Sequence, residues 1–376
     1  MRLFEPFTIE NKLKLKNHVV MPPVVTRLAT TEGLVTDALI DRYLLYAKGG
    51  AALVITEAVS VKKQKSGQLL RLNDDEFIPG LKSLTQRVHG ETDAKIAPQI
   101  LHFLKVARGG YRQKVEDLSL EEVKEIPQLF AKAASRAREA QFDAVELHFA
   151  HAYTMASFLS RYNHRTDEYG GSLKKRLRLA EEIVKTSRKA VGNDYVLGAR
   201  INGDEFTFGG NSLEQSRSIA LKLAELGLDY ISLTAGGKFE DAIRREGESI
   251  DPYTGYSGQR SMPPFWMPEK VNVYLAADLK RTLSNAGYHT TIITAGRIPT
   301  ADVAEGVLQN NEADLVGIAR PILADPYWPN KYKEGREKDI LKCVYCNKCR
   351  EAEGAFEEVT CFQWKKKDGT IQIPAP

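Results

Sequence analysis

The sequence predicts a closed (β/α)8 barrel, the TIM-barrel fold, followed by a short cysteine-rich extension. Short apolar runs rich in β-branched residues alternate with helical stretches, eight such runs can be found, and every cysteine lies near the C-terminus. The chain has 376 residues, a length that such a barrel reaches as one domain. We therefore expect a barrel domain over residues 1–341 and a cysteine-rich segment packed on it over residues 342–376.

Eight apolar runs are the candidate strands. Several of them are almost free of polar residues, as expected when helices cover both faces of a parallel sheet. An open, doubly wound sheet is the alternative, and it is disfavoured because no Gly-x-Gly-x-x-Gly fingerprint follows the first run. The runs are Val19–Met21, Ala52–Ile55, Ile96–Leu101, Ala144–Leu147, Val196–Ile201, Tyr230–Thr234, Thr290–Thr294 and Leu315–Ile318.

Helical patterns separate these runs. Leu120–Gln141 carries apolar residues at helical spacing, and Ser119 with Glu122 forms a capping box at its start. Ser212–Leu226 and Lys270–Asn285 are simpler amphipathic helices.

One long stretch interrupts the alternation. Lys238–Pro268 is rich in Gly, Pro, Tyr and Arg, and a loop of this length in a compact domain is usually functional. It is either a substrate lid or a solvated surface loop. As a lid it would offer Arg244, Arg245 and Arg260 as donors to an anionic group such as a CoA phosphate.

Charge and hydropathy exclude several classes of partner. The 53 Lys and Arg residues nearly balance the 49 Asp and Glu residues, and no basic block marks a nucleic-acid-binding tail. No apolar run is long enough to cross a membrane, and Met1–Asn11 lacks a signal-peptide pattern. These features indicate a cytoplasmic protein with no nucleic-acid partner and no membrane span.

The four cysteines have the spacing of a metal site. They follow the pattern Cys343-x2-Cys346-x2-Cys349-x11-Cys361. Three cysteines two residues apart can surround one face of a cubane, and a distant fourth can complete it, so the pattern favours a [4Fe–4S] cluster. A zinc site and disulfides are the alternatives. Zinc ribbons usually have two separate Cys-x2-Cys pairs, and secreted folds spread their cysteines along the chain.

Polar residues gather where the candidate strands end, which is where a barrel of this type places its active site. Gln99 lies near the end of the third run, Arg200 near the end of the fifth, and His148, His151 and Tyr153 follow the fourth. Glycine–arginine pairs follow the seventh and eighth runs, as in a phosphate site where bare backbone N–H groups and guanidinium groups converge. These pairs are Gly296 with Arg297 and Gly317 with Arg320.

At this point the sequence resembles the Old Yellow Enzyme family of NADH:flavin oxidoreductases. More narrowly, it is similar to the iron–sulfur branch that contains the barrel domains of 2,4-dienoyl-CoA reductase and trimethylamine dehydrogenase, which share the cysteine spacing. The resemblance covers almost the whole chain, and its motifs are specific only when taken together. They are Leu3–Phe7, Asn17–Pro23, Ile55–Ala58, Gln99–His102, Glu146–Tyr153, Arg165–Ser172, Ala295–Arg297 and Ala319–Pro326.

The resemblance implies that FMN is the cofactor and that particular residues surround its ring. Pro22, Pro23 and Ala58 would line the flavin through backbone atoms. Gln99 would bond the pyrimidine edge, and Arg200 would lie near N1 and O2, where negative charge collects on reduction.

The resemblance also implies which residues bind the phosphate. At Val25, however, the sequence departs from the family pattern. Gly296, Arg297, Gly317 and Arg320 would hold the phosphate of the cofactor. Val25 occupies the position beside flavin O4 where the family usually has Thr, Cys or His, so this chain offers no donor there.

For catalysis, the resemblance implies that His148 and His151 bind the carbonyl oxygen of the substrate and that Tyr153 donates a proton. Two fixed imidazole donors would stabilise the charge that develops on that oxygen, and a phenol can protonate the α-carbon. The hydride chemistry itself belongs to the flavin.

The sequence therefore predicts an FMN-dependent ene-reductase for an α,β-unsaturated carbonyl compound, with an acyl-CoA thioester as one candidate. Electrons would come from NAD(P)H or, through the cluster, from a ferredoxin or flavoprotein attracted by basic residues around the cysteines (Lys342, Lys348, Arg350 and Lys365–Lys367). An amine dehydrogenase and an electron-transfer subunit are the alternatives. We also expect a homo-oligomer.

Overall fold

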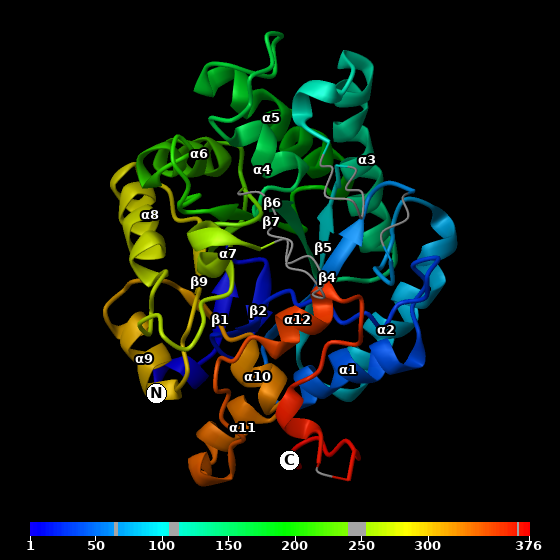
Figure 1. Cartoon of the computed structure of the whole chain (residues 1–376), viewed down its shortest axis with the longest axis vertical. Helices are drawn as coiled ribbons and strands as arrows, with labels where there is room; N and C mark the ends of the chain where they lie inside the picture. Colours follow the sequence, from blue (N-terminus) through cyan, green and yellow to red (C-terminus); the bar gives the residue numbers. More distant parts are fainter. Residues whose placement is uncertain (64–66, 105–112, 240–252, 367) are drawn as a thin grey trace, which may run out of the picture.

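The computed structural model describes residues 1–63, 67–104, 113–239, 253–366 and 368–376, and eight of its strands close into a barrel (Figure 1). Each barrel strand pairs in parallel with the next along the chain, and the last closes on the first. The predicted TIM-barrel fold is confirmed. The strands are β3 (Val19–Met21), β4 (Leu53–Ser60), β5 (Lys95–Leu101), β6 (Ala144–Phe149), β7 (Val196–Asn202), β8 (Tyr230–Thr234), β9 (Thr291–Ala295) and β10 (Leu315–Gly317).

Helices surround the barrel and connect its strands (Figure 1). The α-helices are α1 (Asp37–Lys48), α2 (Ile78–Glu91), α3 (Leu120–Glu139), α4 (Thr154–Leu159), α5 (Leu173–Val191), α6 (Leu213–Glu225), α7 (Gly255–Ser261), α8 (Val273–Asn285), α9 (Ala301–Gln309), α10 (Arg320–Ala324), α11 (Trp328–Lys333) and α12 (Lys348–Gly354). Short 3-10 turns occur at Arg2–Phe4, Asp75–Phe77, Val115–Asp117, Glu337–Asp339 and Phe362–Trp364. No helix among the described residues is both long and apolar enough to span a membrane.

The predicted helices are present, with small differences at their ends. The capping box of α3 is confirmed, because Ser119 Oγ accepts the Glu122 N–H at 3.1 Å and the Glu122 carboxylate accepts the Ser119 N–H at 2.9 Å. Helix α8 begins at Val273 rather than at Lys270. Lys270 has φ 58°, a left-handed backbone that a right-handed helix does not continue through.

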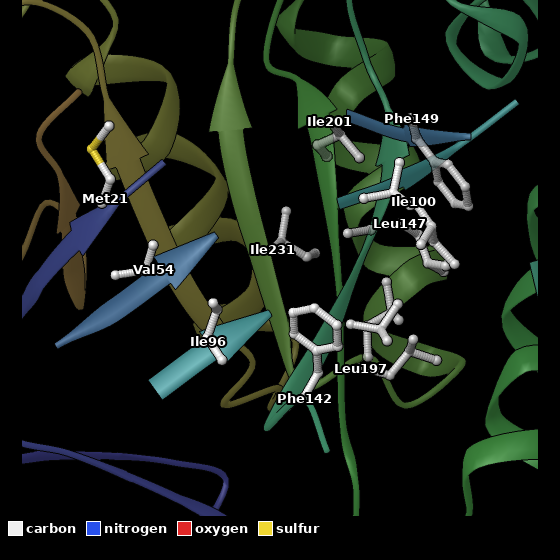
Figure 2. Close-up of a cluster of buried hydrophobic side chains, with 14 of the residues drawn as sticks. Met21, Val54, Ile96, Ile100, Phe142, Leu147, Phe149, Leu197, Ile201 and Ile231 are labelled. Atoms are coloured by element: carbon white, nitrogen blue, oxygen red, sulfur yellow. The ribbon is translucent and has the colours of Figure 1, made fainter. Parts of the chain in front are cut away.

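Alternate residues of the strands form two apolar layers. One set faces outward and packs under the helices, as Figure 2 shows for Val54, Ile96, Leu147 and Leu197. The other set faces the barrel interior, where Leu53, like other inward-facing residues, contacts an N-terminal hairpin. This alternation is the two-residue period of a strand, and it leaves both faces of the sheet buried.

The N-terminal hairpin closes one end of the barrel. Strands β1 (Phe7–Ile9) and β2 (Leu13–Leu15) pair antiparallel, and their apolar residues pack against residues at the beginnings of the barrel strands. The opposite end, where the strands finish, is the end at which a barrel of this type places its active site. The sequence analysis did not predict this hairpin, because runs of three residues carry too little periodicity to be recognised.

Strand β4 is longer than the predicted run Ala52–Ile55. The predicted run ends before the polar residues Thr56 and Glu57, but both are buried in the structure, and Glu57 has hydrogen-bond partners there. The buried Glu57 carboxylate accepts the backbone N–H of Thr26, and the Glu57 N–H donates to the Tyr43 hydroxyl at 2.7 Å. Burial raises the pKa of Glu57 to about 7.

The predicted lid is only partly described. Arg244 and Arg245 lie outside the described residues. Arg260 lies on α7, is 5% exposed, donates to the Val271 carbonyl at 2.8 Å and stands 3.9 Å from the centre of the Phe206 ring. The prediction that Arg260 is a free donor for an anionic substrate is therefore wrong, because its guanidinium is committed to the fold.

The cysteine-rich segment packs on the barrel beside α1 and α10 (Figure 1). Arg42 of α1 donates to the Val359 carbonyl at 2.7 Å, and the Trp364 indole donates to the Ala324 carbonyl at 2.7 Å. The Val359 N–H in turn donates to the Thr26 carbonyl at 3.0 Å, in the stretch that follows β3. The segment thus lies next to the open end of the barrel.

Candidate active site

Three predicted catalytic side chains meet just after β6. The ring centres of His148 and His151 are 5.2 Å apart, and those of His148 and Tyr153 are 5.3 Å apart. They meet because the chain turns sharply between β6 and α4: His151 and Ala152 both have left-handed backbones, with φ of 61° and 60°. Such conformations are uncommon for residues other than glycine and often occur at functional sites.

Both imidazoles are neutral. Burial lowers the pKa of His148 to about 3, with Arg200 and Lys238 adding to the effect. Burial, together with His148, holds the pKa of His151 well below its usual value. A neutral imidazole has one N–H donor and one acceptor. His151 Nε2 is 2.8 Å from the hydroxyl of Thr234, whereas His148 Nδ1 is buried without a hydrogen-bond partner among the described residues.

The structure adds three residues to this group that the sequence analysis missed. Lys238 donates to the Tyr153 hydroxyl at 3.1 Å, and the Tyr253 hydroxyl is 3.5 Å from the same oxygen. Phe103 packs edge-on against the Tyr153 ring, with 5.4 Å between ring centres. Lys238 is the first residue of the stretch Lys238–Pro268 that was assigned to the lid as a whole, and Tyr253 lies near its middle, so no local pattern indicated that they approach Tyr153.

His102 is not part of this group. Its Nδ1 lies 2.9 Å from the Thr154 hydroxyl at the start of α4, and burial lowers its pKa to about 4. This contact ties the end of β5 to the turn that carries Tyr153.

A second polar group crosses the barrel interior at the predicted flavin edge. Gln99 Nε2 donates to Glu146 at 2.6 Å, and Arg200 donates to the Ser232 hydroxyl at 2.9 Å. Burial raises the pKa of Glu146 while the nearby Arg200 lowers it, so the two groups partly compensate each other's burial. Gln99 and Arg200 are therefore held in fixed orientations beneath the open end of the barrel.

The residues expected to line the flavin lie along this same end. Ala58 is in register with Gln99 on the neighbouring strand, and Pro22, Pro23 and Val25 follow β3 directly. Pro22 is buried, whereas Pro23, Val25 and Ala58 are half-buried. The half-buried side chains leave surface that a planar cofactor could cover.

The glycine–arginine pairs converge after β9 and β10. Gly296 has φ 126°, a conformation that favours glycine, and a Cβ on Gly317 would lie 3.1 Å from the Ala295 Cβ. Arg297 and Arg320 make no ion pair with a carboxylate anywhere in the described part of the chain, although Arg320 is only 8% exposed. Buried cations normally have a counter-charge, so this end of the barrel suits an anionic group.

The four thiols are free and lie within electrostatic range of one another. Burial raises the pKa of Cys343, Cys349 and Cys361, and the pKa of Cys349 reaches about 11, while Arg320 lowers those of Cys343 and Cys349. Within the described ranges, no three His, Cys, Asp or Glu side chains are close enough to hold one metal ion. The [4Fe–4S] cluster on these four cysteines therefore stays a prediction from their spacing.

Two N–H groups also approach the sulfur atoms. The Tyr345 N–H donates to Cys343 Sγ at 3.4 Å, and the Gln363 side-chain amide lies 3.8 Å from Cys361 Sγ. Hydrogen bonds of this kind stabilise ligating thiolates and tune the potential of iron–sulfur clusters.

Comparison with known proteins identifies the fold and its relatives. The model of the NADH:flavin oxidoreductase / NADH oxidase family matches residues 2–254 and 266–339. An NADH oxidase of Thermoanaerobacter brockii is 35% identical over 370 residues, covering 92% of this chain and 52% of that protein. The chain thus spans about half the length of this curated relative.

Two solved structures are similar along almost the whole chain. One is a 2-naphthoyl-CoA reductase in complex with 2-naphthoyl-CoA, with a TM-score of 0.83, 27% identity and coverage of 96% of this chain and 56% of that chain. The other is a histamine dehydrogenase from Rhizobium sp. 4-9, with a TM-score of 0.79, 25% identity and coverage of 96% and 52%. One neighbour is thus named for reduction of an acyl-CoA and the other for oxidation of an amine.

Proposed function

Because this chain belongs to the NADH:flavin oxidoreductase / NADH oxidase family and is a flavin-dependent oxidoreductase, we propose that it reduces the carbon–carbon double bond of an α,β-unsaturated carbonyl compound. FMN, when bound, supplies the hydride. The observation that carries the proposal is the meeting of two neutral imidazoles and a phenol after β6.

In this proposal the two histidines bind the carbonyl oxygen. His148, which has a buried nitrogen without a partner, and His151, which Thr234 orients, act as N–H donors to the oxygen on which negative charge develops. Because both imidazoles are neutral, they interact only weakly with the uncharged carbonyl oxygen of the ground state. Their stabilisation therefore grows as the reaction proceeds, which is the condition for lowering the barrier.

Tyr153 supplies the proton to the α-carbon. Lys238, which donates to the Tyr153 hydroxyl, stabilises the negative charge left on that oxygen once the proton has been given up. Phe103 and Tyr253 fix the Tyr153 ring from two sides. Positioning of this kind keeps the proton within reach of the reacting carbon.

The remaining predicted residues would hold the cofactor. Gln99 and Arg200 face the pyrimidine edge of the flavin, and the Arg200 guanidinium would stabilise the reduced form. Pro22, Pro23, Val25 and Ala58 line its ring, and Gly296, Arg297, Gly317 and Arg320 hold its phosphate. The support is the set of half-buried side chains and the guanidiniums of Arg297 and Arg320, which pair with no carboxylate within the ranges that the structure describes.

An amine dehydrogenase is the second candidate, which the similarity to a histamine dehydrogenase favours. An amine substrate is bound as a cation, and aromatic faces are its usual receptors. Here the ammonium of Lys238 already lies 5.0 Å from the centre of the Tyr153 ring and 4.5 Å from that of Tyr253. A second cation would be repelled from these faces, so the arrangement favours the carbonyl substrate.

The substrate class extends to acyl-CoA thioesters, whose carbonyl oxygen accepts hydrogen bonds in the same way. The similarity to a structure named for 2-naphthoyl-CoA supports this extension.

Electrons would reach the flavin from NAD(P)H or through a [4Fe–4S] cluster on Cys343, Cys346, Cys349 and Cys361. Cys346 is exposed, and basic side chains surround the cysteines, so an acidic ferredoxin or flavoprotein would be attracted to this face.

Anaerobic mixing with NADH and with reduced ferredoxin, separately, tests the two routes. If NADH reduces the flavin rapidly and Cys346→Ala leaves turnover unchanged, the cluster route is wrong. Free thiols also suit a reducing compartment such as the cytoplasm.

The substrate class is tested in an anaerobic stopped-flow instrument. Enzyme reduced with NADH should be reoxidised rapidly by a simple enone or enoate, and oxidised enzyme should not be reduced by histamine or trimethylamine. Rapid reduction by an amine, with no reoxidation by any unsaturated carbonyl compound, would reverse the assignment.

A further inference from the structure

The cysteine-rich segment places a tyrosine between the two arginines of the phosphate site. The centre of the Tyr345 ring is 5.2 Å from the guanidinium carbon of Arg297 and 4.7 Å from that of Arg320. Tyr345 stands between Cys343 and Cys346, far along the chain from both arginines. The segment that carries the cysteines therefore forms one wall of the site after β9 and β10.

Tyr345 is held in an unusual conformation to reach this place. Its φ is 54°, a left-handed value that is an outlier for a bulky side chain, and the residue is 5% exposed. A conformation of this kind persists only where the surrounding structure imposes it. Here Asn347 contributes, because it accepts a hydrogen bond from Arg320 at 2.6 Å and donates to the Met262 carbonyl at 2.9 Å.

Several polar groups around Tyr345 have no partner. The Tyr345 hydroxyl and Arg297 Nε are buried and make no hydrogen bond within the described residues. Over the same residues, neither Arg297 nor Arg320 pairs with a carboxylate. A buried hydroxyl without a partner costs free energy, and so does a buried guanidinium without a counter-charge. An anion with several oxygen acceptors would satisfy all of them.

We propose that Tyr345 is a ligand of the flavin phosphate, with its hydroxyl donating to a phosphate oxygen while its ring is held between Arg297 and Arg320. The inference rests on the proposed FMN site and adds to it a residue from outside the barrel. It follows that the cysteine-rich segment helps to bind the cofactor, and that Arg320 contacts both sides, since it also donates to Asn347 of that segment at 2.6 Å.

The test compares two flavins that differ only in the phosphate. Protein stripped of flavin, with its iron retained, is titrated with FMN and with riboflavin, and dissociation constants are measured from the quenching of flavin fluorescence. Tyr345→Phe keeps the ring and the backbone conformation and removes the hydroxyl. The loss of one hydrogen bond to a charged group should weaken FMN binding by about tenfold to one-hundredfold and leave riboflavin binding unchanged.

Tyr195→Phe is the matched control. Tyr195 is also buried, but it lies just before β7 begins, at the opposite end of the barrel. Its hydroxyl donates to the Phe142 carbonyl at 2.8 Å. This variant should change neither flavin affinity. Iron content and a thermal melt confirm that Tyr345→Phe is folded and retains its cluster.

The outcomes separate the two claims. If wild-type protein binds FMN far more tightly than riboflavin, but Tyr345→Phe keeps that ratio, the role of Tyr345 is wrong while the phosphate site stands. If both flavins bind more weakly by the same factor, Tyr345 acts on the ring pocket and the inference is again wrong. If wild-type protein does not distinguish the two flavins, the phosphate site of the proposed function fails together with this inference.

Discussion

The two ends of the candidate site use opposite kinds of electrostatics. Around His148, His151 and Tyr153 the direct donors are neutral groups, and the cation Lys238 contacts the Tyr153 hydroxyl. At the phosphate end, Arg297 and Arg320 carry permanent charge and have no carboxylate partner among the described residues. Neutral donors respond to charge that appears during a reaction, whereas fixed charges bind an anion that is always present. The difference assigns turnover to one end and cofactor retention to the other.

Tyr153→Phe should have the largest effect on turnover. If Tyr153 protonates the α-carbon, its loss should slow reoxidation of the flavin by an enoate by about 10²–10⁴-fold, with reduction of the flavin unaffected. Stopped-flow traces of the two half-reactions measure both rates. Tyr162→Phe, which removes an exposed phenol outside the group, should leave both unchanged. Normal reoxidation in Tyr153→Phe would show that another group is the proton donor.

His148→Ala removes a donor to the developing negative charge. The rate of reoxidation by an enone should fall by about 10²–10³-fold, the usual cost of one oxyanion donor, while FMN affinity stays the same. His89→Ala is the control, because His89 lies on α2 and pairs with Asp143 at 2.7 Å, away from the site. A variant that loses FMN without losing its rate per bound flavin would place His148 at the cofactor instead.

The catalytic end and the phosphate end of the site also differ in how well the sequence predicted them. His148, His151 and Tyr153 fall within six residues, so a single strand end revealed them. Lys238 reaches Tyr153 only through the closure of the barrel, and nothing in its local sequence marks it. Tyr345 was not predicted, because it stands among cysteines whose spacing indicates only a metal site.

The same reasoning applies to the fold. Periodicity located every barrel strand, because buried parallel strands are apolar runs. It ended β4 too early, at Ile55, because a buried carboxylate with tertiary partners, such as Glu57, looks the same in a sequence as an exposed one. The hairpin β1–β2 was missed because its buried residues find their contacts only once the barrel exists.

The pH dependence of turnover should distinguish neutral from charged imidazoles. Since the pKa of His148 is lowered to about 3 and that of His151 is also held well below its usual value, both are neutral at and above the pH where an ordinary histidine titrates. The rate of reoxidation by an enone should therefore show no histidine transition between about pH 5 and 8. A transition near the ordinary histidine pKa that disappears in His148→Gln would contradict the assignment of neutral donors.

Val25→Thr should have the smallest effect, on the flavin potential. Val25 offers no hydrogen bond to flavin O4, and a donor there would favour the reduced flavin. The midpoint potential of the bound flavin should therefore rise, with no change in the ratio of FMN to riboflavin affinity. An unchanged or lower potential, measured by anaerobic dye equilibration, would show that residue 25 does not face O4.

The proposed function depends on the histidine pair, which holds a carbonyl oxygen so that hydride reaches the β-carbon and a proton reaches the α-carbon. It is tested most directly by reducing an enone with nicotinamide deuterated at the transferred position and locating the label by NMR. The expected product has one deuterium at the β-carbon and a solvent-derived hydrogen at the α-carbon. Deuterium at the α-carbon, or a saturated product without label at either carbon, would contradict it.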